Sequence, residues 1–115
     1  MDQEQAIILA ADYAQKVRCI MNPNDVILYG SYAKGNFCAD SDIDIAVIFD
    51  VFNGDYWQTV QRLHELTIVV DTRIEPVLLE SNNDPSGFVE TVRREGVKVS
   101  STACIGYDMV IAPLL

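Results

Sequence analysis

Apolar residues along this chain alternate between helical and strand spacing, and this alternation predicts its secondary structure. In residues 3–21, apolar side chains recur every three or four positions, as on one face of a helix, and Asp2 can cap the first turn. The same spacing over residues 55–70 predicts a second helix, with expected buried positions at Tyr56, Val60, Leu63 and Thr67. Both segments are therefore expected to be amphipathic helices.

Short apolar runs bounded by turn residues predict strands between and after these helices. The expected strands are VILYG at 26–30, SDIDIAVIFD at 41–50, TRIEPVLLE at 72–80 and an edge strand at 97–101. A brief helical turn is expected at 31–34, and a further helix within 84–96, capped by Ser86 and ended by Gly96. Helices that alternate with strands indicate one α/β domain of two or three layers over residues 1–115.

Charge and composition exclude several classes of function. The chain has 115 residues, half of them hydrophobic, and a net charge of −9 from 17 acidic and 8 basic residues. It has no basic cluster, so direct binding of a long nucleic acid is not expected. No apolar run approaches the roughly 20 residues needed to span a bilayer, and the acidic N-terminal stretch lacks the basic region of a signal peptide. We therefore expect a cytoplasmic protein without a membrane segment.

Two carboxylates stand at the start of the apolar strand predicted at 41–50. Alternate side chains of a strand share one face, so Asp42 and Asp44 point the same way, with Cα atoms about 6.6 Å apart. Like charges this close disfavour each other's ionisation unless a cation lies between them. Oxygen ligands without histidine or cysteine favour Mg²⁺ over zinc. A solvated turn is the alternative interpretation, because Ala-Asp-Ser-Asp is also typical of loops.

A Gly-Ser pair ends the preceding strand, and ten residues separate Ser31 from Asp42, the first of these carboxylates. Gly30 permits a close approach of the backbone that a Cβ would block, and Ser31 opens a helical turn. Backbone N–H groups and a hydroxyl in such a turn can hold phosphate oxygens. A phosphate-binding turn that faces a metal-binding acid pair favours phosphoryl or nucleotidyl transfer.

These residues resemble the signature of the minimal nucleotidyltransferases of the DNA polymerase beta superfamily. The full signature, Gly-Ser-x-x-x-Gly-x-x-x-x-x-Ser-Asp-x-Asp, is met at Gly30, Ser31, Gly35, Ser41, Asp42 and Asp44. The order of the predicted elements also agrees, so the resemblance covers nearly the whole chain. It implies a small polymerase beta-like nucleotidyltransferase fold, in which a short mixed sheet packs against helices.

The family has a third carboxylate on the next strand, and this sequence offers two candidates for it. Asp71 and Glu75 share a face if the strand includes both, and Pro76 holds Glu75 in an extended conformation. We choose Glu75, because Asp71 falls where the preceding helix ends. The alternative for Glu75 is a salt bridge with Arg73, two residues away on the same face.

The resemblance implies a role for each residue of the site. In such enzymes two Mg²⁺ ions bind the acidic residues and a nucleoside triphosphate such as ATP. Carried over to this chain, the metal ligands are Asp42, Asp44 and Glu75, and the groups that hold the β- and γ-phosphates are Gly30 and Ser31, with Lys34 as a helper. Glu75 is also the expected acceptor of the hydroxyl proton. Tyr32 and Phe37 flank the phosphate-binding turn and are candidates to line a nucleotide pocket.

The resemblance also implies a protein partner. Family members of this size are commonly paired with a small helical protein of the HEPN type, and some act as antitoxins by adding AMP to it. The apolar residues Val110, Ile111, Leu114 and Leu115 suggest a surface that another subunit, including a second copy of the chain, covers. Two other functions stay open: neutralisation of a toxin by binding alone, and nucleotidyl transfer to a small molecule.

Overall fold

The computed structural model of the chain describes residues 1–99. The elements in chain order are α1 (Gln3–Ile20), β1 (Asp25–Tyr29), α2 (Ser31–Lys34), β2 (Ile43–Phe49), α3 (Tyr56–Val70), β3 (Ile74–Glu80), α4 (Phe88–Glu95) and β4 (Val97–Lys98). They follow the elements expected from sequence, with boundaries that differ by a few residues. The apolar segment that includes Val110 and Ile111 lies outside the described residues.

The strands form one mixed sheet with the order β3-β2-β1-β4. The central strand β2 pairs antiparallel with β1 and parallel with β3, and the short strand β4 pairs antiparallel with β1. Ile45 and Val47 point to one face of β2, while Ala46 and Ile48 point to the other, and all four are fully buried. The continuous apolar run of β2 is therefore explained by burial on both faces.

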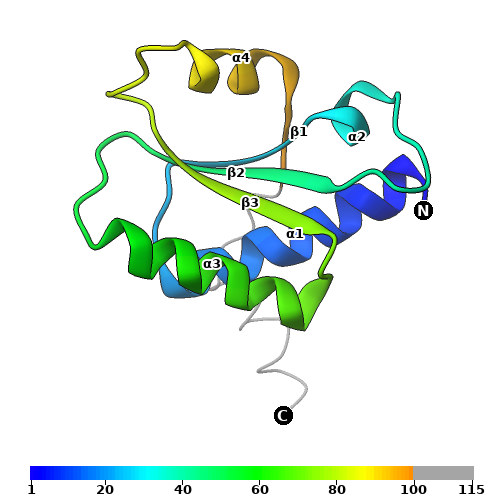
Figure 1. The fold of residues 1–115 in the computed structure, drawn as a ribbon, viewed down its shortest axis with the longest axis horizontal. Helices are drawn as coiled ribbons and strands as arrows, with labels where there is room; N and C mark the ends of the chain where they lie inside the picture. The colour runs from blue at the N-terminus through cyan, green and yellow to red at the C-terminus, as the bar shows by residue number, and fades with distance from the viewer. Residues whose placement is uncertain (100–115) are drawn as a thin grey trace, which may run out of the picture.

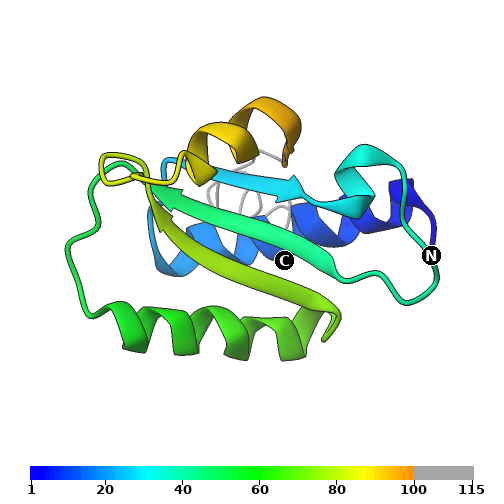
Figure 2. The same cartoon turned by 45° about the horizontal axis from the view of Figure 1, so that its top comes forward.

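Helices cover both faces of this sheet, so the domain has three layers. Helices α1 and α3 lie on one face and α4 lies on the other (Figure 1, Figure 2). The core under α1 and α3 is the larger of two, and Val89 and Val92 of α4 pack on the opposite face with Ile27 and Ile48. Within residues 1–99, no helix combines the length and apolar character needed to cross a membrane. The predicted α/β fold with a short mixed sheet is confirmed.

Helix α1 is fixed at its start and at its middle by polar contacts. The Asp2 carboxylate accepts a hydrogen bond from the Gln5 amide at 2.8 Å, and the Gln5 side chain accepts one from the Asp2 amide at 2.9 Å. This reciprocal pair satisfies two backbone donors at the helix start, as expected for the cap at Asp2. The buried Tyr13 hydroxyl donates to the carbonyl of Leu63 at 2.6 Å and so ties α1 to α3.

Helix α3 buries only a narrow face. Leu63 and Thr67 are buried as expected, but Tyr56 is 44% exposed and its neighbour Trp57 is 76% exposed. The expected burial of Tyr56 is wrong because this residue lies in the first turn of the helix, where its ring meets Trp57 edge-on at 5.1 Å instead of the core. The outer face of α3 is therefore partly apolar.

The cap of helix α4 differs from the prediction. Gly87 occupies the capping position with φ of 75°, and the Asp84 carboxylate accepts from the amides of Val89 and Glu90 at 3.1 and 3.3 Å. Ser86, the predicted cap, accepts only a long 3.4 Å bond from Phe88. The prediction of Ser86 is wrong because a carboxylate two residues earlier reaches the free amides and also neutralises the positive end of the helix. Gly96 ends the helix as expected.

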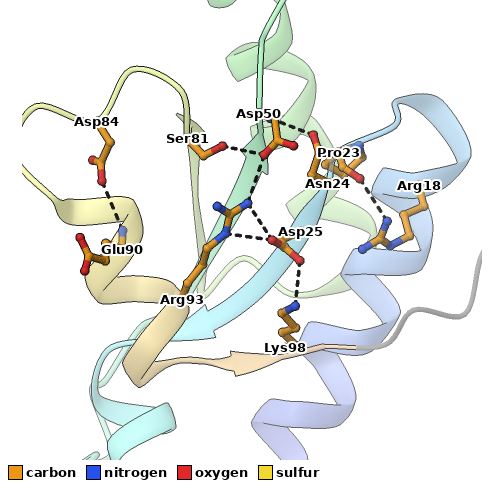
Figure 3. A network of polar contacts seen from close by, with 10 residues as sticks. All are labelled: Arg18, Pro23, Asn24, Asp25, Asp50, Ser81, Asp84, Glu90, Arg93 and Lys98. Carbon is orange, nitrogen blue, oxygen red and sulfur yellow. Dashed lines mark hydrogen bonds and ion pairs between the residues drawn. The ribbon is translucent and has the colours of Figure 1, made fainter.

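A polar network ties α4 to the end of the sheet opposite α2 (Figure 3). The Arg93 guanidinium lies 2.8 Å from the Asp25 carboxylate and 3.4 Å from that of Asp50. Asp50 accepts a 2.6 Å hydrogen bond from the Ser81 hydroxyl, and Lys98 lies 3.4 Å from Asp25. Arg93 therefore joins α4 to the start of β1 and to the loop that follows β2.

Loss of this network is expected to destabilise the fold. Arg93→Ala leaves the partly buried Asp25 with only the exposed Lys98, so the free energy of unfolding should fall by about 1–2 kcal/mol. The matched control is Arg94→Ala, because within residues 1–99 the ionic partner of Arg94 is its neighbour Glu95 and its side chain is 62% exposed. Its effect should stay within about 0.5 kcal/mol. Urea unfolding of the two variants checks this, and equal losses would contradict a special role of Arg93.

Candidate active site

Three polar side chains form a row across the sheet, one on each of three neighbouring strands. Tyr29 of β1 is paired in register with Asp44 of β2, and Asp44 is paired in register with Glu75 of β3. Side chains alternate between faces along a strand, so all three lie on the α4 side, as Ile27 and Ala46 do. Partners directly opposite have Cα atoms about 5 Å apart. The register thus brings Glu75 next to Asp44.

Asp42 adds a third carboxylate at the same end of the sheet. It precedes β2 directly and is exposed, as is Glu75, while Asp44 is half-buried. Among residues 1–99, none of these three carboxylates forms a hydrogen bond or an ion pair with another side chain. In the same part of the chain, no three acidic, histidine or cysteine side chains converge into a ready-made metal site. The carboxylates are neighbours along the backbone, but their oxygens do not meet at one point.

The electrostatics of the row follow from this concentration of negative charge. Burial raises the pKa of Asp44, and the carboxylates of Asp42 and Glu75 raise it further. Burial also raises the pKa of Tyr29, followed by the carboxylates of Asp44 and Glu75. Both carboxylates lie close enough to the phenol for their negative charge to disfavour its ionisation. Within residues 1–99, no cationic side chain forms an ion pair with Asp44 or Glu75 to balance this charge.

Gly30 touches the row from the end of β1. Its φ is 77°, in a region that residues with a side chain rarely adopt. A Cβ at this position would overlap Oδ2 of Asp44 and lie 3.2 Å from its Cγ. The expected close approach at Gly30 is thus present, but the group that comes close is the Asp44 carboxylate of the same chain.

Helix α2 presents Ser31 beside this contact. Ser31 is half-buried, and its hydroxyl forms no hydrogen bond with any other residue in the described range. Lys34 is exposed and lies 3.7 Å from Glu95, so it has an ionic partner in α4. Tyr32 is 1% exposed and stacks on Phe37 at 4.6 Å. Tyr32 therefore supports α2 from within the core, and the suggestion that its ring lines a nucleotide pocket is wrong.

Asp71, the alternative third carboxylate, has a different partner. It follows α3, and its two carboxylate oxygens accept from the Arg73 side chain at 2.9 and 2.6 Å. The hydrogen bond from Arg73 lowers the pKa of Asp71. Arg73 thus pairs with Asp71, which leaves Glu75 without the salt bridge considered from sequence. Of the two candidates, the structure places only Glu75 in the row with Asp44.

The arrangement combines three carboxylates and a hydroxyl that have no side-chain partner among the described residues with a glycine in close contact. Carboxylates in such a group can hold divalent cations, while Ser31 and the backbone near Gly30 can bind phosphate oxygens. Tyr29 completes the row and was not considered from sequence. The signal that could have revealed it is its place directly before Gly30, since a strand that ends there must pair Tyr29 with a residue of β2.

Comparisons with known proteins bear on the family and the fold of the chain. A family profile described as "Polymerase beta, Nucleotidyltransferase" matches residues 11–103 of the chain. A search of curated proteins found no significant match. Among solved structures, the chain resembles a protein from Sulfolobus solfataricus that is provisionally described as a nucleotidyltransferase. The two share 19% sequence identity with a TM-score of 0.61, over 84% of this chain and 80% of the other. At this identity, the similarity concerns the fold.

Proposed function

Because this chain belongs to the polymerase beta nucleotidyltransferase family, we propose that it transfers AMP from ATP to a hydroxyl group of a protein partner. Nucleotidyl transfer is the activity of the family, and its members typically use a nucleoside triphosphate with divalent metal ions. The nucleotide and the acceptor are the parts that this proposal adds.

The observation that carries the proposal is the register pair of Asp44 and Glu75 next to Gly30. It gathers the acidic residues of the sequence signature and a third carboxylate at one end of the sheet. A purely structural role would favour a cationic partner for such a group, and the described residues provide none. Clustered carboxylates that stay unpaired support a site that binds cations.

Mg²⁺ fits this donor set. The three side chains offer hard oxygen ligands. Burial, followed by the negative charges of Asp42 and Glu75, raises the pKa of Asp44, and a cation would offset both effects. We assign Asp42, Asp44 and Glu75 as the residues that hold two Mg²⁺ ions. When bound, such ions neutralise the triphosphate and make a hydroxyl a better nucleophile.

The chain's own residues divide the remaining tasks. Gly30 and Ser31 hold the β- and γ-phosphates, with Lys34 as an exposed helper that can exchange Glu95 for a phosphate oxygen. The hydroxyl oxygen of the acceptor attacks the α-phosphorus, and the bond from this phosphorus to the bridging oxygen breaks. Pyrophosphate leaves with the bonding electrons. Glu75, an exposed carboxylate of the row, accepts the proton of the hydroxyl.

The proposed acceptor is a side chain of a helical HEPN-type protein, which makes this chain an antitoxin. The net charge of −9 disfavours an RNA acceptor, since phosphate contacts from basic residues supply most affinity for nucleic acids. The outer layer of helices exposes large apolar side chains, with Ile8 60%, Ile68 73% and Val69 65% exposed. Apolar surface of this kind favours a protein contact.

The test is co-expression with the protein encoded beside this chain. With ATP and Mg²⁺, the intact mass of that partner is expected to rise by one AMP unit, and native mass spectrometry should show a complex of the two proteins. A second copy of the chain in place of the partner would indicate a homo-oligomer.

Glu75→Gln provides the inactive comparison, because it removes the proton acceptor and changes little in side-chain size. The partner mass should then stay unchanged. AMP found on tRNA or on an aminoglycoside would contradict the protein acceptor. Neutralisation of the toxin by Glu75→Gln as well as by wild type would contradict catalysis as the basis of the antitoxin role.

A further inference from the structure

We propose that Tyr29 is an additional substrate-binding residue, whose hydroxyl donates a hydrogen bond to a β- or γ-phosphate oxygen of the nucleoside triphosphate. The inference rests on the proposed function, because it extends the phosphate-binding part of the same site. The sequence signature begins only at the next residue, Gly30, and does not include Tyr29.

The position of Tyr29 carries the first part of the inference. It is the last residue of β1 and precedes Gly30 and Ser31, so its side chain stands at the edge of the phosphate-binding turn. Strand register places it beside Asp44 on the α4 side of the sheet. A phosphate that Ser31 holds, with its charge neutralised by a metal ion at Asp44, would therefore lie within reach of the Tyr29 side chain.

The chemistry of the row carries the second part. Asp44 and Glu75 supply only acceptor oxygens when ionised, while a phenol supplies an O–H donor. Of the cationic side chains nearby in sequence, Arg73 pairs with Asp71, and Lys34 must first give up its pair with Glu95 to reach a phosphate oxygen. A neutral donor is compatible with the carboxylates of the row and with a phosphate oxygen. Tyr29 thus provides what its two neighbours in the row cannot.

The ring of Tyr29 is held in place before any substrate binds. Phe88, the first residue of α4, meets it edge-on with ring centroids 5.7 Å apart. Tyr29 also packs against the apolar core beneath α4. A donor fixed in this way loses little side-chain entropy when it forms its hydrogen bond. Helix α4 therefore takes part in the site indirectly, through the contact of Phe88 with Tyr29.

Tyr29→Phe tests the hydroxyl alone, because the ring and its contact with Phe88 are kept. Binding of ATP and of pyrophosphate, each with Mg²⁺, is measured by calorimetry on the free protein, and AMP serves as a probe without the β- and γ-phosphates. Loss of a hydrogen bond to a charged group should weaken ATP and pyrophosphate binding about tenfold. Binding of AMP and the melting temperature of the ligand-free protein should not change.

Tyr56→Phe is the matched control, since Tyr56 is an exposed tyrosine of α3 that lies outside the row and undergoes the same chemical change. It should bind all three ligands as wild type does. Wild-type affinity of Tyr29→Phe for ATP and pyrophosphate would overturn the inference and leave the proposed function standing. An equal loss for AMP would also overturn it, by moving the contact to the nucleoside. Wild-type protein that binds none of the ligands would overturn both proposals.

Discussion

Replacement of Asp44 by asparagine is expected to reduce nucleotidyl transfer by about 10³-fold or more while the fold is kept. Asp44 lies at the centre of the row, between Tyr29 and Glu75, and is the carboxylate that touches Gly30. Asparagine has nearly the same shape but cannot neutralise Mg²⁺. The loss of several kcal/mol of transition-state stabilisation corresponds to this reduction. Single-turnover transfer of labelled AMP to the co-expressed partner measures it.

The same substitution should raise the stability of the metal-free protein at neutral pH. The pKa of Asp44 is raised in the folded protein, so the folded state binds this proton more tightly than the unfolded chain does. The stability linked to Asp44 is therefore present below its ordinary pKa and is lost as the pH rises through the raised value. Asparagine has no charge to lose, so the variant should melt above wild type at about pH 7 and should lose this advantage near pH 4.

Asp71→Asn is the matched control for both measurements. Asp71 undergoes the same chemical change, but its carboxylate pairs with Arg73 and lies outside the row. The rate of transfer should stay within about twofold of the wild-type rate. The melting temperature of the variant, measured with a chelator that removes metal ions, should not rise above that of wild type. Loss of transfer in Asp71→Asn with activity retained in Asp44→Asn would contradict the placement of the site. Equal melting curves of wild type and Asp44→Asn in chelator would contradict the electrostatic argument.

Gly30→Ala should damage both the site and the fold. The backbone at Gly30, with φ of 77° and ψ of −151°, is almost confined to glycine, and enforcing it on alanine costs about 1–3 kcal/mol. The new Cβ would also overlap the Asp44 carboxylate and displace it from the row. We expect transfer to fall by about 10²-fold or more, because a shift of about 1 Å at reacting groups has effects of this size. Urea unfolding and single-turnover transfer measure the two losses.

Gly35→Ala separates backbone strain from the collision with Asp44. Gly35 also has a positive φ, of 83°, but a Cβ there would meet no atom within 4 Å. This control should lose about 1 kcal/mol of stability and retain most of its transfer activity. If the two alanine variants lose the same stability and activity, the contact between Gly30 and Asp44 has no part in shaping the site.

The sequence was sufficient to predict the fold and to single out the acidic residues as candidates. Apolar spacing predicted the described helices and strands, and the signature pointed to Asp42 and Asp44, of which Asp44 lies on β2 and Asp42 lies directly before it. Glu75 could be preferred over Asp71 because Pro76 keeps it extended within a strand. The decisive fact, that Glu75 lies opposite Asp44, depends on the register of two parallel strands joined through α3. Register of this kind cannot be read from local spacing.

Contacts between distant segments account for most of what sequence analysis missed. Lys34 pairs with Glu95, which belongs to α4, and local patterns do not reveal which helix will lie beside α2. Tyr29 gains significance only from its partner strand. At the start of α4, a serine near the helix was chosen as the cap, while the turn at Gly87 brings the earlier Asp84 to the free amides. Each of these features depends on how the chain folds back on itself.

The mixed sheet implies an order in which the site is assembled during folding. Strands β1 and β2 are joined only through α2 and its loop, so they can pair early, and this step brings Tyr29, Gly30 and Asp44 together. Pairing of β2 with β3 must wait for the longer connection through α3, because closing a longer loop costs more chain entropy. Glu75, the proposed proton acceptor, is therefore expected to meet Asp44 after Tyr29 and Gly30 do. A chain in which β1 and β2 alone have paired gathers the phosphate-binding residues but lacks the base, so we expect the capacity for transfer to arise only once β3 has paired with β2.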